Sequence, residues 1–232
     1  MAIGTGGFII SNFAEIIFSI PKTLWFNFKV LPIKKAIKLP CVVSYHIKIK
    51  GVNKKNFIFL QENPASFSVR IGFGSSLGAR RQSKKGLVSI ENGGKIVLCG
   101  KTGFSQGVIL ATNGAEIKFG ENFRCNYSST IDATNDNITF GENVVIGWNV
   151  TVRNGDGHKI IENGAQKPTS APIKIGNHVW LCAESTVLKG VNLGDDSVLG
   201  YGALLTKANG EKNTLFAGFP AKPIKTDINW QE

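Results

Sequence analysis

Residues 175–205 read IGNHVWLCAESTVLKGVNLGDDSVLGYGALL, a segment that repeats every six residues. An aliphatic side chain occupies every sixth position: Ile175, Leu181, Val187, Leu193, Leu199 and Leu205. Small or β-branched residues stand four positions after the first five of these, at Val179, Ser185, Val191, Ser197 and Ala203. A period of six matches neither a helix nor the simple alternation of an isolated strand. It is typical of a parallel β-helix, in which each short strand turns a corner and stacks on the coil below.

The same period continues toward the N-terminus in groups of three residues. The earlier groups are Leu98, Phe104 and Leu110; Phe119, Cys125 and Ile131; and Phe140, Ile146 and Val152. Three hexads make one triangular coil, so each group predicts one coil, which buries its apolar row only by stacking on its neighbours. Ile71 and Leu77 are expected to begin the first coil, whereas residues 80–97 follow no clear period.

A long insertion interrupts the repeat between Val152 and Ile175. These two residues are 23 positions apart, whereas the earlier groups are separated by nine. Residues 153–172, RNGDGHKIIENGAQKPTSAP, are therefore expected to leave the coil as a protruding loop. A loop of this length in a tightly wound domain is usually functional.

The length of 232 residues favours one main domain with an N-terminal addition. We predict a cap over residues 1–65, a solenoid over residues 66–215 and a C-terminal closure and tail over residues 216–232. The four cysteines lack Cys-x-x-Cys spacing. We therefore expect buried, reduced thiols and neither disulfides nor a metal site.

The N-terminal segment combines an apolar run with a basic one. Residues 8–20, FIISNFAEIIFSI, have helical apolar spacing, but the run is short for a membrane span and contains Glu15. It also lacks a basic leader, so we do not expect a signal peptide. Nine lysines follow between residues 22 and 55 and supply much of the formal net charge of +11.

Two interpretations of residues 1–60 remain open. The segment can cap the open end of the solenoid, which any solenoid requires, and we favour this interpretation slightly. It can also contact an anionic membrane through its aromatic residues and lysines. Nucleic-acid binding is not expected, because the lysines lack the motifs of nucleic-acid-binding domains. These features predict a cytoplasmic protein, with the inner face of the plasma membrane as the alternative location.

His158 in the loop is the best candidate for a catalytic residue. Imidazole is suited to take and return a proton near neutral pH. The chain has two other histidines. His46 has no supporting residues around it, and His178 occupies a regular hexad and is most simply a surface residue. The glycine-flanked position of His158 in a protruding loop favours catalysis.

Three segments carry a resemblance to a known family. They are the GDGH motif at residues 155–158, the segment Ile175–Leu181, and the tail TKANGEKNTLFAGFPAKPIK at residues 206–225 with its Ala-Gly-x-Pro-Ala-Lys closure. Together with the repeat, they resemble the hexapeptide-repeat acyltransferases. The D-G-H loop followed by N-x-V-W, and the leader TLWFNFKVLPIKKAIKLP, are most similar to O-acetyltransferases of bacterial surface polysaccharides and lipopolysaccharides.

This resemblance implies an all-β fold: a left-handed parallel β-helix with an N-terminal helical or irregular cap and a protruding catalytic loop. It implies a homotrimer with the active site between neighbouring solenoids, acetyl-CoA as donor and a carbohydrate hydroxyl as acceptor. His158 would take the proton of that hydroxyl and return it to the departing thiolate. One departure is Phe219, which stands where the family commonly carries Asn.

Further site residues are expected around the donor and the acceptor, Trp180 from the same resemblance and the others from their residue types and positions. Trp180 would line the groove, or else fill a trimer contact. Asp156 would orient the imidazole, although a turn role is favoured for it. The residues expected near the coenzyme are Ala183 and Gly202 beside the pantetheine and Lys207, Lys222 and Lys225 beside the phosphates. Arg153 and Asn154 would contact the acceptor, with Arg153 pairing with a carboxylate of an acidic sugar.

Two other functions remain open. The first is N-acetylation of a nucleotide-linked amino sugar by the same superfamily. The basic, apolar leader argues mildly against a small acceptor of that kind. The second is a non-catalytic β-helix scaffold, since fold does not imply activity. A scaffold has no need of a polar loop that carries a histidine.

Overall fold

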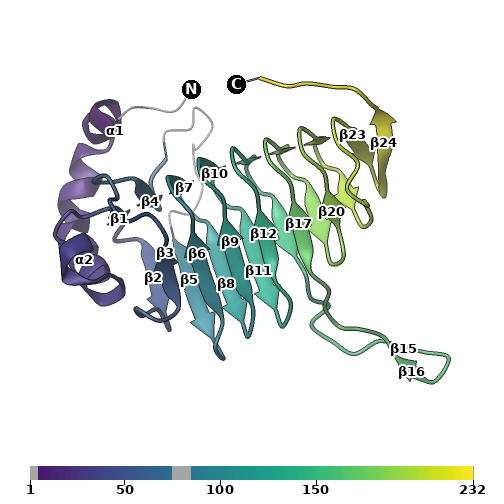
Figure 1. Ribbon diagram of the computed structural model, residues 1–232, viewed down its shortest axis with the longest axis horizontal. Coiled ribbons are helices and arrows are strands. Elements are labelled where there is room, and N and C mark those ends of the chain that lie inside the picture. The colour runs from purple at the N-terminus through teal and green to yellow at the C-terminus, as the bar shows by residue number, and fades with distance from the viewer. Residues whose placement is uncertain (1–4, 75–84, 232) are drawn as a thin grey trace.

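The computed structural model describes residues 5–74 and 85–231 and has the predicted fold, a left-handed parallel β-helix. Three sheets form the sides of the triangular solenoid (Figure 1). Sheet A contains β1 (Cys41–Val43), β4 (Val69–Ile71), β7 (Thr102–Phe104), β10 (Phe123–Cys125), β13 (Val145–Ile146), β18 (Trp180–Leu181), β21 (Val198–Leu199), β23 (Leu215–Gly218) and β24 (Ala221–Lys225).

The other two sheets complete each coil, and their strands pair in parallel. Sheet B contains β2 (Ile47–Lys50), β5 (Gly86–Glu91), β8 (Ile109–Asn113), β11 (Thr130–Thr134), β14 (Thr151–Arg153), β19 (Thr186–Leu188) and β22 (Leu204–Leu205). Sheet C contains β3 (Phe57–Phe59), β6 (Lys95–Leu98), β9 (Glu116–Phe119), β12 (Ile138–Phe140), β17 (Ile173–Ile175) and β20 (Asn192–Leu193).

The predicted groups of three are the inward columns of the solenoid. In sheet C, Leu98, Phe119, Phe140, Ile175 and Leu193 pair in register from one coil to the next. The other two columns pass through Phe104, Cys125, Ile146, Leu181 and Leu199 in sheet A and through Leu110, Ile131, Val152, Val187 and Leu205 in sheet B. All of these side chains are buried. Burying each of the aliphatic and aromatic side chains contributes about 1.5–3 kcal/mol relative to leaving it exposed.

The solenoid begins earlier than the predicted boundary at residue 66. The first coil is formed by β1, β2 and β3, and Val43 pairs with Ile71 of the second coil. This coil was not predicted from the sequence, because lysines such as Lys48 alternate with its inward residues and resemble part of a basic cap. Ile71 therefore belongs to the second coil, and Leu77 lies outside the described residues.

Helices cover the N-terminal end of the solenoid: α1 (Thr5–Ser11) and α2 (Phe13–Val30), which are labelled in Figure 1, and the short α3 (Ile33–Ala36). Phe26 of α2 packs edge-on against Phe57 of the first coil, with ring centroids 5.1 Å apart. The Asn27 carboxamide donates to the Cys41 carbonyl at 2.6 Å and accepts from the Cys41 N–H at 3.1 Å. These bonds satisfy polar groups at the open end of sheet A, each of which would cost about 1–3 kcal/mol if buried without a partner.

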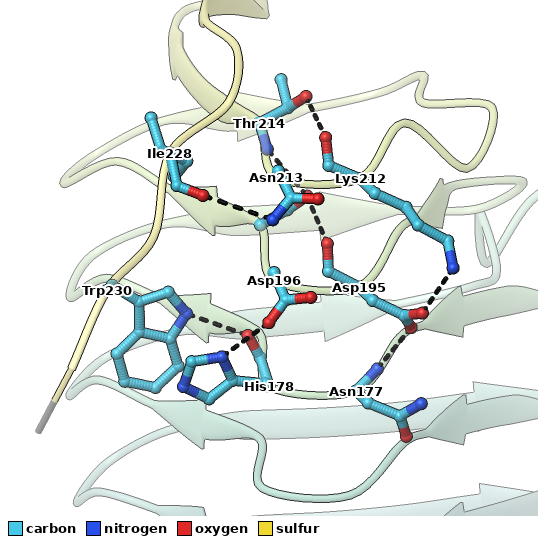
Figure 2. Close-up of polar contacts among 10 residues, drawn as sticks. Asn177, His178, Asp195, Asp196, Lys212, Asn213, Thr214, Ile228 and Trp230 are labelled. Atoms are coloured by element: carbon cyan, nitrogen blue, oxygen red, sulfur yellow. Dashed lines mark hydrogen bonds and ion pairs between the residues drawn. The ribbon is translucent and has the colours of Figure 1, made fainter.

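The described helices include none that is both long and apolar enough to cross a membrane. At the opposite end of the solenoid, β23 and β24 form an antiparallel pair over the last coil. The chain then turns back along the solenoid, so that its last described residues lie beside earlier coils (Figures 1 and 2).

Candidate active site

The loop of residues 153–172 leaves the solenoid between β14 of sheet B and β17 of sheet C (Figure 1). Its outer part contains a short antiparallel pair, β15 (Ile161–Glu162) and β16 (Ala165–Gln166). The columns of the core continue across it, since Val152 pairs with Val187 and Phe140 with Ile175. The solenoid therefore does not use the loop to fill its core.

Asn154 fixes the base of this loop. Its side chain is fully buried. The carboxamide donates to the Asp136 carbonyl at 2.5 Å and accepts from the Thr134 N–H at 2.8 Å. The Ala171 N–H donates to the Asn154 carbonyl at 3.2 Å and so ties the two ends of the loop together. Both ends of the Asn154 carboxamide are therefore used inside the chain, where they fix the base of the loop.

His158 is exposed on the loop. Within residues 5–74 and 85–231, its ring makes no hydrogen bond or ion pair. Asp156 does not orient it, because that carboxylate forms an ion pair with Lys189 and its N–H donates to the Thr169 carbonyl at 2.8 Å. The Lys189 ammonium also donates to the Pro168 carbonyl at 2.7 Å. Asp156 thus fastens the loop to the solenoid and leaves the imidazole available to groups outside this chain.

Arg153 lies beside the GDGH segment. A Cβ placed on Gly157 would be 3.5 Å from the Arg153 Nη2 atom, so the guanidinium borders the residue before His158. Its Nε is 3.3 Å from an oxygen of Asp132, and about half of the side chain is exposed. Arg153 is therefore the predicted acceptor residue that the structure does bring close to His158.

Trp180 lies on the outward side of sheet A, 39% exposed, and not at the corner from which the loop departs. Its ring centroid is 5.8 Å from that of Trp230. Trp180 and the His158 loop thus occupy different faces of a single chain. One chain alone does not assemble the two predicted site residues.

The residues expected near the coenzyme gather toward the C-terminal end of the solenoid. Ala183 and Gly202 occupy the same corner on successive coils, where the Gly202 N–H donates to the Ala183 carbonyl at 3.1 Å. Gly202 has a φ of +65°, and a Cβ placed there would meet no atom within 4 Å, so this corner is open to a ligand. The three lysines of the set are exposed: Lys207, Lys222 and Lys225. Phe219 is 79% exposed in the turn between β23 and β24.

A second cluster, centred on His178, was not predicted (Figure 2). The His178 Nδ1 atom is 2.8 Å from an oxygen of Asp196, one coil further along. The ring stacks on Trp230, with centroids 4.2 Å apart and planes inclined by 9°. The Trp230 Nε1–H donates to the His178 carbonyl at 2.9 Å. The cluster holds the C-terminal tail against the solenoid.

Comparisons with known proteins support the sequence interpretation. A family model described as the hexapeptide repeat of succinyl-transferase matches residues 172–207. Galactoside O-acetyltransferase of Escherichia coli (strain K12) is 34% identical over 133 residues, covering 56% of this chain and 63% of that protein. Polysialic acid O-acetyltransferase of Escherichia coli O1:K1 / APEC is 32% identical over 127 residues, covering 54% of this chain and 41% of that protein.

The chain thus spans less than two thirds of the length of these curated relatives. The crystal structure of a polySia-specific acetyltransferase superposes with a TM-score of 0.58 at 22% identity, covering 83% of this chain and 79% of that one. That likeness shows a shared fold. The resemblance to the hexapeptide-repeat acyltransferases, which the repeat and the GDGH loop indicated, is confirmed.

Proposed function

We propose that this chain, a hexapeptide-repeat protein similar to O-acetyltransferases, transfers an acetyl group from acetyl-CoA to a sugar hydroxyl of a bacterial surface polysaccharide. The observation that carries the proposal is the exposed His158 on a loop that the solenoid core does not need. The loop base is nevertheless fixed through Asn154 and through the ion pair of Asp156 with Lys189. A protruding loop that has a fixed base and exposes an imidazole suits a catalytic base.

The proposed reaction needs one proton acceptor. The His158 imidazole takes the proton of the acceptor hydroxyl while that oxygen attacks the thioester carbonyl carbon. The new C–O bond forms, the C–S bond breaks, and the proton passes from the imidazolium to the sulfur of the coenzyme. The products are the sugar ester and the free thiol. General base catalysis of this kind contributes about 10²–10⁴ in rate.

The donor would lie along the corner marked by Ala183 and Gly202. The open space at Gly202 leaves room for the pantetheine arm close to the backbone. The exposed ammonium groups of Lys207, Lys222 and Lys225 supply positive charge for the phosphates. Each of these lysines taken alone is an ordinary surface residue. The support for phosphate binding comes from the position of all three at the same end of the solenoid.

We propose a homotrimer as the active assembly. His158 and Trp180 lie on different faces of one chain, and His158 has no partner within the described part of it. A threefold interface joins two different faces of neighbouring copies. It can therefore bring the loop of one chain toward sheet A of the next. N-acetylation of an amino sugar would use the same geometry, and the acceptor assay below separates it from O-acetylation.

The N-terminal helices favour binding to a second partner, the anionic inner face of the plasma membrane. Their inner side caps the solenoid, but their outer side exposes large apolar residues: Ile9, Ile10, Phe13, Ile17, Phe18, Ile20, Leu24, Trp25, Phe28, Ile33 and Ile37. Exposed Lys29 and Lys34 lie among them. An apolar surface with basic residues suits the interface of a bilayer that contains anionic lipid.

The test of the proposed reaction is thiol release from acetyl-CoA, measured with bacterial oligosaccharides and with nucleotide-linked amino sugars. We expect release that depends on an oligosaccharide, and a fall of about 10²-fold or more in the His158→Ala variant. His46→Ala is the matched control and should keep full activity. Full activity in His158→Ala would remove the catalytic assignment. Failure of the wild-type protein to bind or cleave acetyl-CoA with any acceptor would favour the scaffold.

A further inference from the structure

A basic cavity lies on the outward side of sheet A, next to α1. Its volume is about 260 Å³. Three cationic side chains line it: Arg70, Lys101 and Arg124. The described residues that line the cavity include no Asp or Glu. Among the residues that the structure describes, this concave site therefore gathers three positive charges and no acid, which favours an anionic ligand.

Gly103 forms a gap between the two arginines. It pairs in register with Arg70 on one side and with Arg124 on the other, so all three face outward in one row. Adjacent strands lie about 4.8 Å apart, which places the two arginine backbones about 10 Å from each other. A Cβ placed on Gly103 would meet no atom within 4 Å. The space between the two guanidinium-bearing residues is therefore open down to the backbone.

Arg70 is held in place at one end of this gap. Its Nε donates to the Phe67 carbonyl at 3.3 Å, and its guanidinium carbon lies 4.0 Å from the centroid of the Phe8 ring. Burial lowers the pKa of Arg70, but an arginine remains charged at any physiological pH. The hydroxyl of Ser68, which also lines the cavity, is buried and has no hydrogen-bond partner among the described residues. The site thus offers a fixed cation and an unused polar group.

We propose that this cavity binds a carboxylate of the acceptor, so that the acceptor is an acidic glycan. A planar carboxylate matches the paired donors of a guanidinium. The remaining lining adds polar groups that can bond sugar hydroxyls, the carboxamides of Asn122 and Asn126. This inference rests on the proposed acetyl transfer to a carbohydrate and adds the class of sugar.

A second cavity offers room for neighbouring sugar units. It has a volume of about 380 Å³ and is lined by Arg124, Asn143, His178, Asn229, Trp230 and Gln231. Arg124 lines both cavities, so they adjoin along sheet A. His178 and Trp230, whose side chains Figure 2 shows, are two of its lining residues. A glycan of several units can therefore follow the sheet across successive coils.

Binding should be measured without acetyl-CoA, so that the result does not depend on catalysis. The probes are oligogalacturonate, oligoglucuronate and oligosialic acid, each compared by calorimetry with its own methyl ester, which keeps the sugar and removes the charge. Inorganic phosphate and CoA are the competing anions. Gly103→Val fills the gap without strain, and Arg124→Gln removes one charge. Their matched controls are Ala111→Val on sheet B and Lys174→Gln on sheet C.

We expect at least one acidic oligosaccharide to bind about tenfold or more tightly than its methyl ester. Gly103→Val and Arg124→Gln should each weaken that binding about tenfold, whereas the two controls should not change it. The proposal would be overturned if the protein bound each acidic oligosaccharide and its methyl ester with equal affinity. The proposal would also be overturned if both variants lost only the binding of phosphate or CoA and kept the binding of the acidic oligosaccharides. If the protein acetylated a neutral sugar and bound no acidic oligosaccharide more tightly than its ester, the acidic class of the acceptor would be wrong. The proposed acetyl transfer would still stand.

Discussion

Trp230 lies flat against the ring of His178 and donates its Nε1–H to the carbonyl of the same residue at 2.9 Å. The two residues are 52 positions apart, and only the turn of the chain after β24 brings them together (Figure 2). The Ile228 N–H donates to the Asn213 carbonyl at 2.9 Å on the same corner. The tail is therefore attached by defined contacts along one edge of sheet A.

Removal of the Trp230 ring should release this tail. Stacking and one hydrogen bond together contribute about 1–3 kcal/mol. In Trp230→Ala, we expect the Ile228 amide to exchange with solvent at least about tenfold faster, as measured by hydrogen exchange. Trp230→Phe keeps the stacking and loses the hydrogen bond, so its exchange rate should be intermediate. Unchanged exchange in Trp230→Ala would mean that other contacts hold the tail.

Asn154 should prove a structural residue of the loop. Asn154→Ala removes the partners of the Thr134 N–H and the Asp136 carbonyl, and each buried group left without a partner costs about 1–3 kcal/mol. We expect a lower denaturant midpoint and faster exchange of the Thr134 amide. Ser170→Ala, also at the loop base but only partly buried, is the milder comparison. If Asn154→Ala kept wild-type stability and raised only the acceptor KM, the residue would contact substrate after all.

The ion pair of Asp156 with Lys189 should act on His158 through the position of the loop. Both partners are partly exposed, so we expect a small loss of overall stability from either Asp156→Ala or Lys189→Ala. We expect kcat to fall about tenfold in each variant, with little change in the acetyl-CoA KM.

The double variant tests whether Asp156 and Lys189 act as a pair. If the pair acts as one unit, Asp156→Ala with Lys189→Ala should be no slower than either single variant. Glu162→Ala, which removes a different ion pair of the loop, that with Lys167, is the matched control. Additive losses in the double variant would show that Asp156 and Lys189 act independently.

Asp195 should contribute a pH-dependent interaction. The hydrogen bond from the Lys212 ammonium at 2.8 Å, and then that from the Asn177 N–H at 2.9 Å, lower the pKa of this carboxyl from 3.8 (Figure 2). A pKa lowered by folding stabilises the folded chain above the unfolded pKa, and the stabilisation is lost as the pH falls through the folded pKa. The stability difference between wild type and Asp195→Asn should therefore be constant near neutral pH and shrink below about pH 4. Thermal unfolding across this range measures it, and a difference that grew in acid would contradict the assignment.

The core columns could be predicted from the sequence because each position requires an apolar side chain at a fixed interval. Leu98, Phe119 and Phe140 show this directly. The His158 loop could be predicted because it breaks that interval. The contact of Trp230 with His178 could not, since the tail has no period and its path depends on where the chain turns back. Arg70 and Arg124 could not be assigned to one row either, because the early coils differ in length and hide the register.

The exposed side of α1 and α2 should bind anionic bilayers. Ile10, Phe13 and Phe18 are exposed, and each large apolar side chain that enters a bilayer contributes about 1.5–3 kcal/mol. We expect the protein to sediment with vesicles that contain phosphatidylserine, and less with phosphatidylcholine alone. Replacing all three residues with serine should weaken this binding about 10²-fold or more. Lys29→Gln with Lys34→Gln should weaken it less and remove much of its salt dependence. Light scattering of the same proteins without lipid is the control. If the wild type did not bind vesicles and the serine variant lost the trimer, this surface would instead form contacts between copies of the chain.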